Sequence, residues 1–124
     1  MKYKEIGNTG QFIAAIGQGC MGIGGEFKKN SNLDKEFLWS LEYGIDLGMT
    51  FIDTAEVYAN GHSETLVGKV AKSKRDKIFI ATKFSPENNS YNNVLASAEK
   101  SLNRLDTSYI DLYQIHWPNP TIPI

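Results

Sequence analysis

Short apolar runs alternate with helical stretches along this 124-residue chain, and this alternation limits the possible folds more than any other feature. The runs at residues 51–52 and 78–81 are continuously apolar, which is typical of strands that are covered on both faces. A further strand is expected over residues 109–116. Strands that alternate with helices favour a parallel α/β sheet with right-handed crossovers.

Helical patterns fill the stretches before these three strands. The first begins at Ser31, because Asp34 three places on resembles a capping box, and it ends at Gly48. The second begins near Ser63, and the third covers residues 92–105. Apolar residues at helical spacing are expected to face the core: Leu33, Phe37, Leu38, Leu41 and Ile45 in the first, Leu66, Val67, Val70 and Ala71 in the second, and Val94, Leu95, Ala98, Leu102 and Leu105 in the third.

The start of the chain predicts different elements. Residues 3–13 have the pattern of a β-hairpin with a turn at Gly7-Asn8-Thr9-Gly10. A short strand to residue 19 and a loop rich in Gly, Lys and Asn follow. Past the last strand, three residues prevent an immediate helix: Pro118, Pro120 and Pro123.

Composition narrows the class of protein. A hydrophobic content of 41% and a net charge of −1 are those of an ordinary globular chain, with no electrostatic reason to bind nucleic acid or an acidic membrane. A single cysteine, Cys20, suits a reducing compartment. No signal peptide, membrane span or metal site is expected, so we expect a cytoplasmic protein. A basic cluster at Lys69, Lys72, Lys74 and Arg75 is interpreted as a solvated helix end.

Polar residues follow the apolar runs at the points where the strands end. Asp53, Lys83 and His116 each close a strand, and Tyr58 lies five residues beyond Asp53. Because ligands of parallel α/β sheets gather at the carboxyl ends of strands, these side chains are expected to share one rim. A phenol, whose ordinary pKa is about 10, becomes a useful acid beside an ammonium. A carboxylate can hold the ammonium in place, and an imidazole can donate to a carbonyl oxygen.

Each of these residues also has a purely structural interpretation. Asp53 could cap a loop, Tyr58 could be a surface aromatic, and Lys83 could be a solvated strand end. His116 could be bonded within a turn. Four such residues on one rim favour an acid/base site over coincidence.

The pattern Gly17-Gln18-Gly19-Cys20-Met21-Gly22 matches G-x-G-x-x-G. A dinucleotide site of that type needs a helix that begins at the glycines, whereas the next helical pattern here begins near Ser31. A glycine-rich loop at the end of the first strand is therefore favoured. Cys20 is expected to be a small buried hydrophobe, and His62, before the second helix, receives no catalytic role.

Four segments together resemble the aldo-keto reductase family. One is the glycine-rich segment Gly17-Gln18-Gly19-Cys20-Met21-Gly22, which resembles the family's first-strand loop near the nicotinamide. Residues 53–58 with Gly61-His62-Ser63-Glu64 are similar to the motif around its catalytic Asp and Tyr. Ala81-Thr82-Lys83 is similar to its Lys strand, and residues 101–105 with 109–118 are similar to the stretch that ends in its His. The resemblance implies a partial (β/α)8 TIM barrel, with its first four strands, three helices and an N-terminal β-hairpin.

The resemblance also implies NADPH-dependent reduction of aldehydes or ketones. Tyr58 would donate the proton, Lys83 paired with Asp53 would make Tyr58 a stronger acid, and His116 would orient the carbonyl. The cofactor NADPH would lie against Gly19, Cys20, Met21 and Asp53. The substrate would be a small carbonyl compound.

Two small departures and one large one accompany the resemblance. Asn119 stands where the family often has an acid, and Ala59 stands where Gly often follows the Tyr. A barrel of this kind takes about 250 residues, so residues 1–124 are expected to be the N-terminal half of the barrel domain, without most of the cofactor site. The half could be inactive alone, could pair with itself or with a complementary C-terminal half, or could be a non-catalytic binding module.

Overall fold

The computed structural model describes residues 1–122 and contains two sheets. Strands β1 (Tyr3–Glu5) and β2 (Phe12–Ala14) form the antiparallel hairpin that was expected. The parallel sheet has the order β3-β4-β5-β6, with β3 at Gln18–Gly19, β4 at Phe51–Asp53, β5 at Phe79–Phe84 and β6 at Leu112–Ile115. Pro123 lies outside the described residues.

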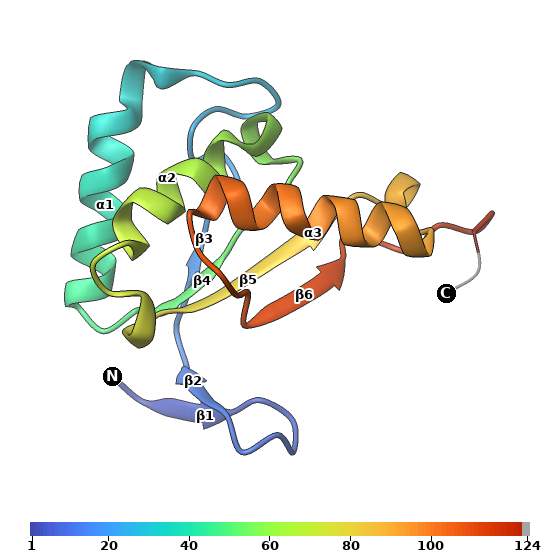
Figure 1. Cartoon of the computed structure of the whole chain (residues 1–124). Coiled ribbons are helices and arrows are strands. Elements are labelled where there is room, and N and C mark those ends of the chain that lie inside the picture. Colours follow the sequence, from blue (N-terminus) through green and yellow to red (C-terminus); the bar gives the residue numbers. More distant parts are fainter. Residues whose placement is uncertain (123–124) are drawn as a thin grey trace.

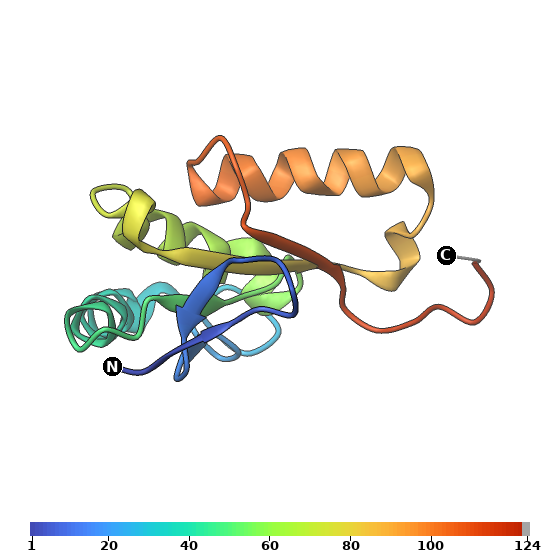
Figure 2. The ribbon, with the colours of Figure 1, turned by 90° about the horizontal axis from the view of Figure 1, so that it is seen from below.

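Helices connect successive parallel strands and lie on one side of the sheet. They are α1 (Asp34–Asp46), α2 (His62–Ala71) and α3 (Tyr91–Leu105). Short 3₁₀ turns precede or follow them: η1 (Ser31–Leu33), η2 (Tyr58–Gly61), η3 (Arg75–Lys77) and η4 (Pro86–Asn88). Figures 1 and 2 show the helices arranged one after another around the outer side of a curved sheet. None of the helices in residues 1–122 is long and apolar enough to cross a membrane.

The core lies between the helices and the outer face of the sheet. Ile52 of β4 and Ile80 of β5 are fully buried there, against Leu41 of α1 and Val67 of α2. Because side chains alternate along a strand, the neighbours of these residues face the opposite, inner side of the sheet. α3 approaches α2 closely, since a Cβ on Gly68 would lie 2.5 Å from the carbonyl oxygen of Leu105. The expected inward face of α2 is confirmed, because Leu66, Val67, Val70 and Ala71 are all buried.

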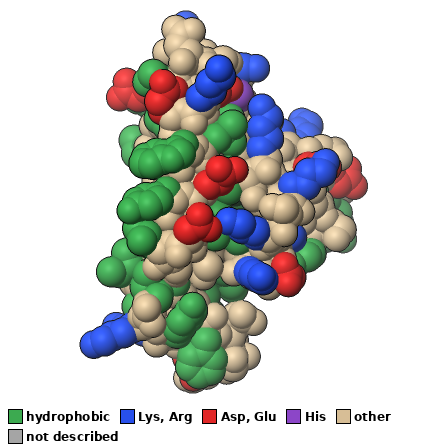
Figure 3. Space-filling view, turned by 90° about the vertical axis from the view of Figure 1, so that its left-hand side faces the viewer, with side chains coloured by type: hydrophobic (Ala, Val, Ile, Leu, Met, Phe, Trp, Pro, Cys, Tyr) green, Lys and Arg blue, Asp and Glu red, His purple; other side chains and the backbone are tan. Residues whose placement is uncertain are grey.

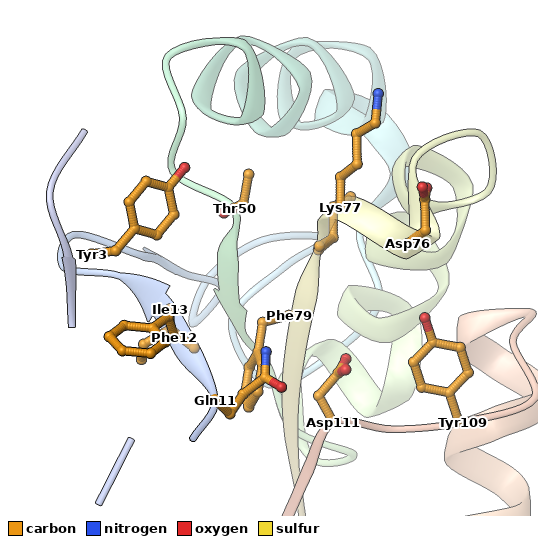
Figure 4. Close-up of a pocket in the computed structure, with 11 residues that line it drawn as sticks. Tyr3, Gln11, Phe12, Ile13, Thr50, Asp76, Lys77, Phe79, Tyr109 and Asp111 are labelled. Atoms are coloured by element: carbon orange, nitrogen blue, oxygen red, sulfur yellow. The ribbon is translucent and has the colours of Figure 1, made fainter. Parts of the chain in front are cut away.

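The hairpin lies at the amino ends of the parallel strands, away from the rim where the strands end (Figure 1). A hollow of about 440 Å³ opens between the hairpin and the sheet. Figure 4 shows Phe12 and Ile13 of the hairpin on one side of this hollow, Phe79 of β5 between, and Tyr109 on the other side. This hollow contains none of the four expected catalytic residues, so it is not the acid/base site.

Three sequence predictions about helices need correction. Asn30, not Ser31, caps the first helical turn, because its side-chain oxygen accepts from the amide of Asn32 at 3.1 Å. Leu33 belongs to this turn and is exposed rather than buried. In α3, Leu95 is half exposed while Ser97 and Ser101 are buried. Two inward positions of α3 are small because the close approach of α2 leaves little room for larger side chains, while Leu105 is buried at the end of the helix.

The strand limits and the basic cluster also differ from expectation. β3 is limited to Gln18–Gly19, and β6 begins at Leu112 rather than Tyr109. Arg75 is not a solvated cation: its guanidinium bonds the Asp111 carboxylate at 2.6 Å and stacks on the Tyr109 ring at 3.8 Å. The segment before β6 is therefore fixed by Arg75 side-chain contacts together with two hydrogen bonds between Asp111 and Ile80, at 3.2 Å from the Asp111 amide and at 2.8 Å to its carboxylate.

Candidate active site

An ion pair joins the ends of β4 and β5. The ammonium of Lys83 lies 2.6 Å from the Asp53 carboxylate and donates to the carbonyl oxygen of Thr54 at 2.8 Å. Both side chains point to the inner face because their neighbours Ile52 and Thr82 are buried on the outer face. The side chains of Lys83 and Asp53 are 15% and 34% exposed, so the pair can be reached from solvent.

Tyr58 and His116 meet beside this pair. The Tyr58 hydroxyl lies 3.5 Å from Nε2 of His116, and the two rings are edge to face with centroids 5.5 Å apart. The Lys83 ammonium lies 5.4 Å from the centroid of the Tyr58 ring. The four residues expected at one rim are thus brought together there.

Left-handed backbone turns the chain directly after Tyr58. Ala59 has φ 50° and Asn60 has φ 54°, in a region that residues with a Cβ rarely occupy. Ala59 is also completely buried. The positive φ explains why glycine suits the position after the tyrosine. With alanine at this position, the backbone of the loop is strained.

Two buried networks support the rim from below. The hydroxyls of Thr54 and Ser63 lie 3.0 Å apart, and Ser63 donates to the carbonyl oxygen of Cys20 at 3.2 Å. On the outer face, Thr82 donates to the fully buried Glu64 carboxylate at 2.7 Å, which also accepts from Arg104 at 2.6 Å. These contacts fix the residues next to Asp53 and Lys83 in sequence.

Glu56 is a residue of this region that the sequence analysis did not single out. Its carboxylate accepts from the amide of Ser85 at 2.6 Å and from the side chain of Asn88 at 3.0 Å. In the sequence, the position of Glu56 between Asp53 and Tyr58 is the feature that could have identified it. This spacing does not reveal that the Glu56 carboxylate contacts the segment after β5.

The residues expected to contact a cofactor lie at the end of β3. Gly19 is exposed and pairs with Asp53 across the sheet, and Met21 is 70% exposed. Cys20 is fully buried, and its amide donates to the carbonyl oxygen of Asp53 at 2.8 Å. Burial, with Asp53 nearby, raises the pKa of the Cys20 thiol to about 12. The thiol is therefore inert and belongs to the core, as expected for a small buried hydrophobe.

The glycine pattern at Gly17 to Gly22 does not open a helix, because the chain continues through turns until η1 and α1. His62 begins α2, is buried, and its Nε2 lies 2.9 Å from the Asp34 carboxylate at the start of α1. It therefore connects two helices away from the acid/base cluster.

Electrostatics favour neutral His116. Burial and the nearby Lys83 ammonium lower the pKa of His116 below 6.5, and the carboxylates of Asp53 and Glu56 offset this only in part. Nδ1 of His116 is buried and has no hydrogen-bond partner among the described residues. A neutral imidazole carries one ring proton, and with that proton on Nε2 the ring would be a hydrogen-bond donor at the rim.

Comparison with known proteins agrees with these features. The sequence model of the Aldo/keto reductase family matches residues 15–124. Aldo-keto reductase YhdN of Bacillus subtilis (strain 168) is 40% identical over 134 residues, which cover 100% of this chain and 40% of YhdN. The chain thus spans about 40% of the length of the curated relatives it matches first.

Solved structures lead to the same family. The thermostable aldo-keto reductase Tm1743, in complex with the inhibitor epalrestat, matches with a TM-score of 0.96 and 48% identity, over 99% of this chain and 45% of its own. An aldo/keto reductase from Klebsiella pneumoniae, in complex with NADP and acetate, matches with a TM-score of 0.82 and 34% identity, over 89% of this chain and 38% of its own. The predicted partial (β/α)8 barrel is confirmed, and the chain belongs to the aldo/keto reductase family.

Proposed function

We propose that this chain takes part in the NADPH-dependent reduction of aldehydes and ketones, with Tyr58 as the proton donor. The observation that supports this most directly is the contact of the Tyr58 hydroxyl with Nε2 of His116 at 3.5 Å, beside the Lys83 ammonium. A carbonyl oxygen placed between these two groups would receive hydrogen bonds from both. The arrangement therefore suits delivery of a proton to an oxygen that gains negative charge.

Each polar group of the cluster has one task in this proposal. His116 Nε2–H donates to the substrate carbonyl oxygen and holds it near the phenol. The O–H bond of Tyr58 breaks as its proton moves to that oxygen, and the ammonium of Lys83 stabilises the charge left on the phenolic oxygen. Asp53, 2.6 Å from Lys83, keeps the ammonium charged and in place.

The end of β3 fits the nicotinamide part of a cofactor. A Cβ built on Gly19 would meet nothing within 4 Å, so this strand end opens onto free space beside Asp53. Gly19, Met21 and Asp53 would contact the ring there, while Cys20 would offer only its backbone because its thiol is buried. When bound, the reduced nicotinamide supplies the hydride for the carbonyl carbon.

The test is NADPH consumption by the purified 124-residue chain with a panel of aldehydes. Turnover that is lost in Tyr58→Phe would support the proposal, since this change removes only the proton that the mechanism uses. Absence of turnover in the unaltered chain would contradict activity of the chain by itself. NADPH binding without turnover would favour a binding module instead.

Exposed surfaces favour a second candidate, association with another half of a barrel. The partner would be a second copy of this chain or a complementary C-terminal half. Within residues 1–122, β3 and β6 each have one edge without a strand partner. Trp39, Tyr43 and Leu47 are exposed apolar residues on and just past α1. Figure 3 shows hydrophobic side chains gathered along the left of the face that it presents. Size-exclusion chromatography that shows a monomer at high concentration would argue against pairing of the chain with itself.

A further inference from the structure

Three backbone hydrogen bonds hold the loops of the rim side by side. The amide of Thr54 donates to the carbonyl oxygen of Ala81 at 2.9 Å, and the amide of Glu56 donates to that of Lys83 at 3.0 Å. On the other side of β5, the amide of His116 donates to the carbonyl oxygen of Phe84 at 3.0 Å. The loop after β5 therefore lies between the loop that carries Tyr58 and the segment that carries His116.

We propose that Glu56 is a positioning residue of this rim, whose carboxylate ties the loop that carries Tyr58 to the loop that follows Lys83. One oxygen of this carboxylate accepts both the Ser85 amide and the Asn88 side chain, at 2.6 and 3.0 Å. Glu56 precedes Tyr58 by two residues, and Ser85 follows Lys83 by two. The carboxylate thus joins the loop that carries Tyr58 to the segment that follows Lys83.

The same loop after β5 also contacts the segment beyond His116. The side chain of Asn119 donates to the carbonyl oxygen of Pro86 at 3.0 Å. Movement of residues 85–88 would therefore change the position of His116 as well as that of Lys83. Glu56 fixes this loop from the Tyr58 side, and Asn119 fixes it from the His116 side.

A carboxylate is well suited to this contact. Hydrogen bonds to a charged acceptor are shorter and stronger than those between neutral groups. Without the side chain, the Ser85 amide and the Asn88 amide group lose their acceptor in a partly buried place. The backbone hydrogen bonds still join the strand ends, but residues 85–88 lose their side-chain contact with the Tyr58 loop. A change in the Tyr58–His116 contact is the measurable consequence.

The test compares Glu56→Ala, Glu56→Gln and a control, Glu87→Gln, by NMR of the whole chain. Glu87→Gln removes one negative charge from the loop that Glu56 contacts, but among the described residues the Glu87 carboxylate bonds only the Ser85 hydroxyl two residues away. In the unaltered chain and in the control, we expect a cross-relaxation peak between the Tyr58 and His116 rings, whose centroids lie 5.5 Å apart. We expect this peak to disappear in Glu56→Ala and to return in Glu56→Gln, whose amide oxygen can accept the same two bonds.

Hydrogen exchange of the Ser85 amide gives a second readout that does not need the alanine variant to fold. Glu56→Gln is expected to speed this exchange about tenfold, because a neutral acceptor replaces a charged one. A Tyr58–His116 peak that persists in Glu56→Ala would overturn the proposal, and so would unchanged Ser85 exchange in Glu56→Gln. Equal effects in Glu56→Ala and Glu87→Gln would also overturn it.

The catalytic consequence of Glu56 rests on the proposed function. If NADPH is consumed, Glu56→Ala is expected to lower kcat more than it changes KM, with recovery in Glu56→Gln. The NMR measurements do not depend on turnover. If the proposed function is wrong, the unaltered chain would be inactive although its Glu56 contacts are intact. If this inference is wrong, the Tyr58–His116 contact and the Ser85 exchange would be the same in the Glu56 variants as in the unaltered chain.

Discussion

The two faces of the parallel sheet differ sharply although they alternate residue by residue. Ile52 faces the helices and is fully buried, while its neighbour Asp53 faces inward and pairs with Lys83. In β5 the buried Thr82 bonds Glu64 under the helices, while Lys83 next to it reaches the rim. The outer face therefore supplies packing, and the inner face supplies charged groups that solvent and ligands can reach.

This difference implies that stability and chemistry can be changed separately. Substitutions that disturb the outer face should unfold the chain and affect activity only through folding. Substitutions on the inner face should leave unfolding almost unchanged and affect binding or proton transfer. Substitutions on the two faces and at the rim test this separation, and those with the larger expected effects are given first, each with its control.

Arg104→Met should have the largest effect on stability. It leaves the fully buried Glu64 carboxylate without its cation, whereas Thr82 still donates to the other oxygen. Breaking a buried ion pair costs about 3–5 kcal/mol, and the lower end applies because Arg104 is partly exposed. Urea denaturation would measure the loss.

Lys72→Met is the matched control for Arg104→Met. Lys72 also pairs with a carboxylate at the end of α3, Asp106, but both side chains are mostly exposed. Little change in the denaturation midpoint is expected, because exposed pairs contribute little. Equal losses in the two variants would contradict the assignment of stability to the outer face.

Gly68→Ala and Gly19→Ala compare the two faces with one kind of substitution. A Cβ on Gly68 would lie 2.5 Å from the carbonyl oxygen of Leu105, so α2 and α3 must move apart. We expect a loss of about 1–3 kcal/mol in the free energy of unfolding. On Gly19 the same methyl meets nothing within 4 Å, so stability should change by less than about 0.5 kcal/mol.

Binding of NADPH should be weakened more by Gly19→Ala than by Gly68→Ala, which is the reverse of their effects on stability. If the nicotinamide lies at the end of β3, the methyl of Gly19→Ala takes up space that the ring needs. Titration with NADPH, followed by fluorescence, should then show weaker binding in Gly19→Ala than in the unaltered chain. Unchanged binding would show that the cofactor does not lie against Gly19.

Ala59→Gly should stabilise the rim by a smaller amount. Left-handed backbone costs a residue with a Cβ about 1–2 kcal/mol, which Gly would avoid at Ala59. Gly loses about 0.4–1 kcal/mol more in conformational entropy on folding, so a net gain of up to about 1.6 kcal/mol is expected. A rise in the melting temperature would show this gain, and a fall would mean that the Ala59 methyl contributes more by packing than its backbone costs.

The sequence predicted the inner face well because its signals are local. Asp53, Lys83 and His116 each follow an apolar run, and the carboxyl ends of parallel strands must meet at one edge. The hairpin, the helices and the stop of α1 at Gly48 also depend on residues close in sequence, since Gly48 adopts φ 88° directly after the helix. These parts of the fold and of the site could be read without knowing any tertiary contact.

The errors arose where distant parts of the chain decide the structure. Leu95 was expected inside because it fits the helical stripe, but the close approach of Gly68 to Leu105 directs smaller side chains inward. Arg75 was expected to be solvated, yet it bonds Asp111, 36 residues away. The sequence did not predict a role for Glu56 for the same reason, because its partner Ser85 follows β5. Periodicity carries no information about such contacts.

The smallest effect concerns the charge of His116. Burial and the Lys83 ammonium lower its pKa, so the folded chain binds a proton at His116 less readily than the unfolded chain does. Stability from this source is complete above the unfolded pKa of about 6.5 and is lost as the pH falls through the folded pKa.

Lys83→Met should raise the pKa of His116, because it removes the cation while the burial of the ring remains. An NMR titration can follow this directly, since the chain has two histidines and His62 lies apart from the rim. A His116 midpoint above the pH of the assay in the unaltered chain would mean that the imidazole is charged when it meets the substrate, and that Nε2 of the neutral ring is not the donor.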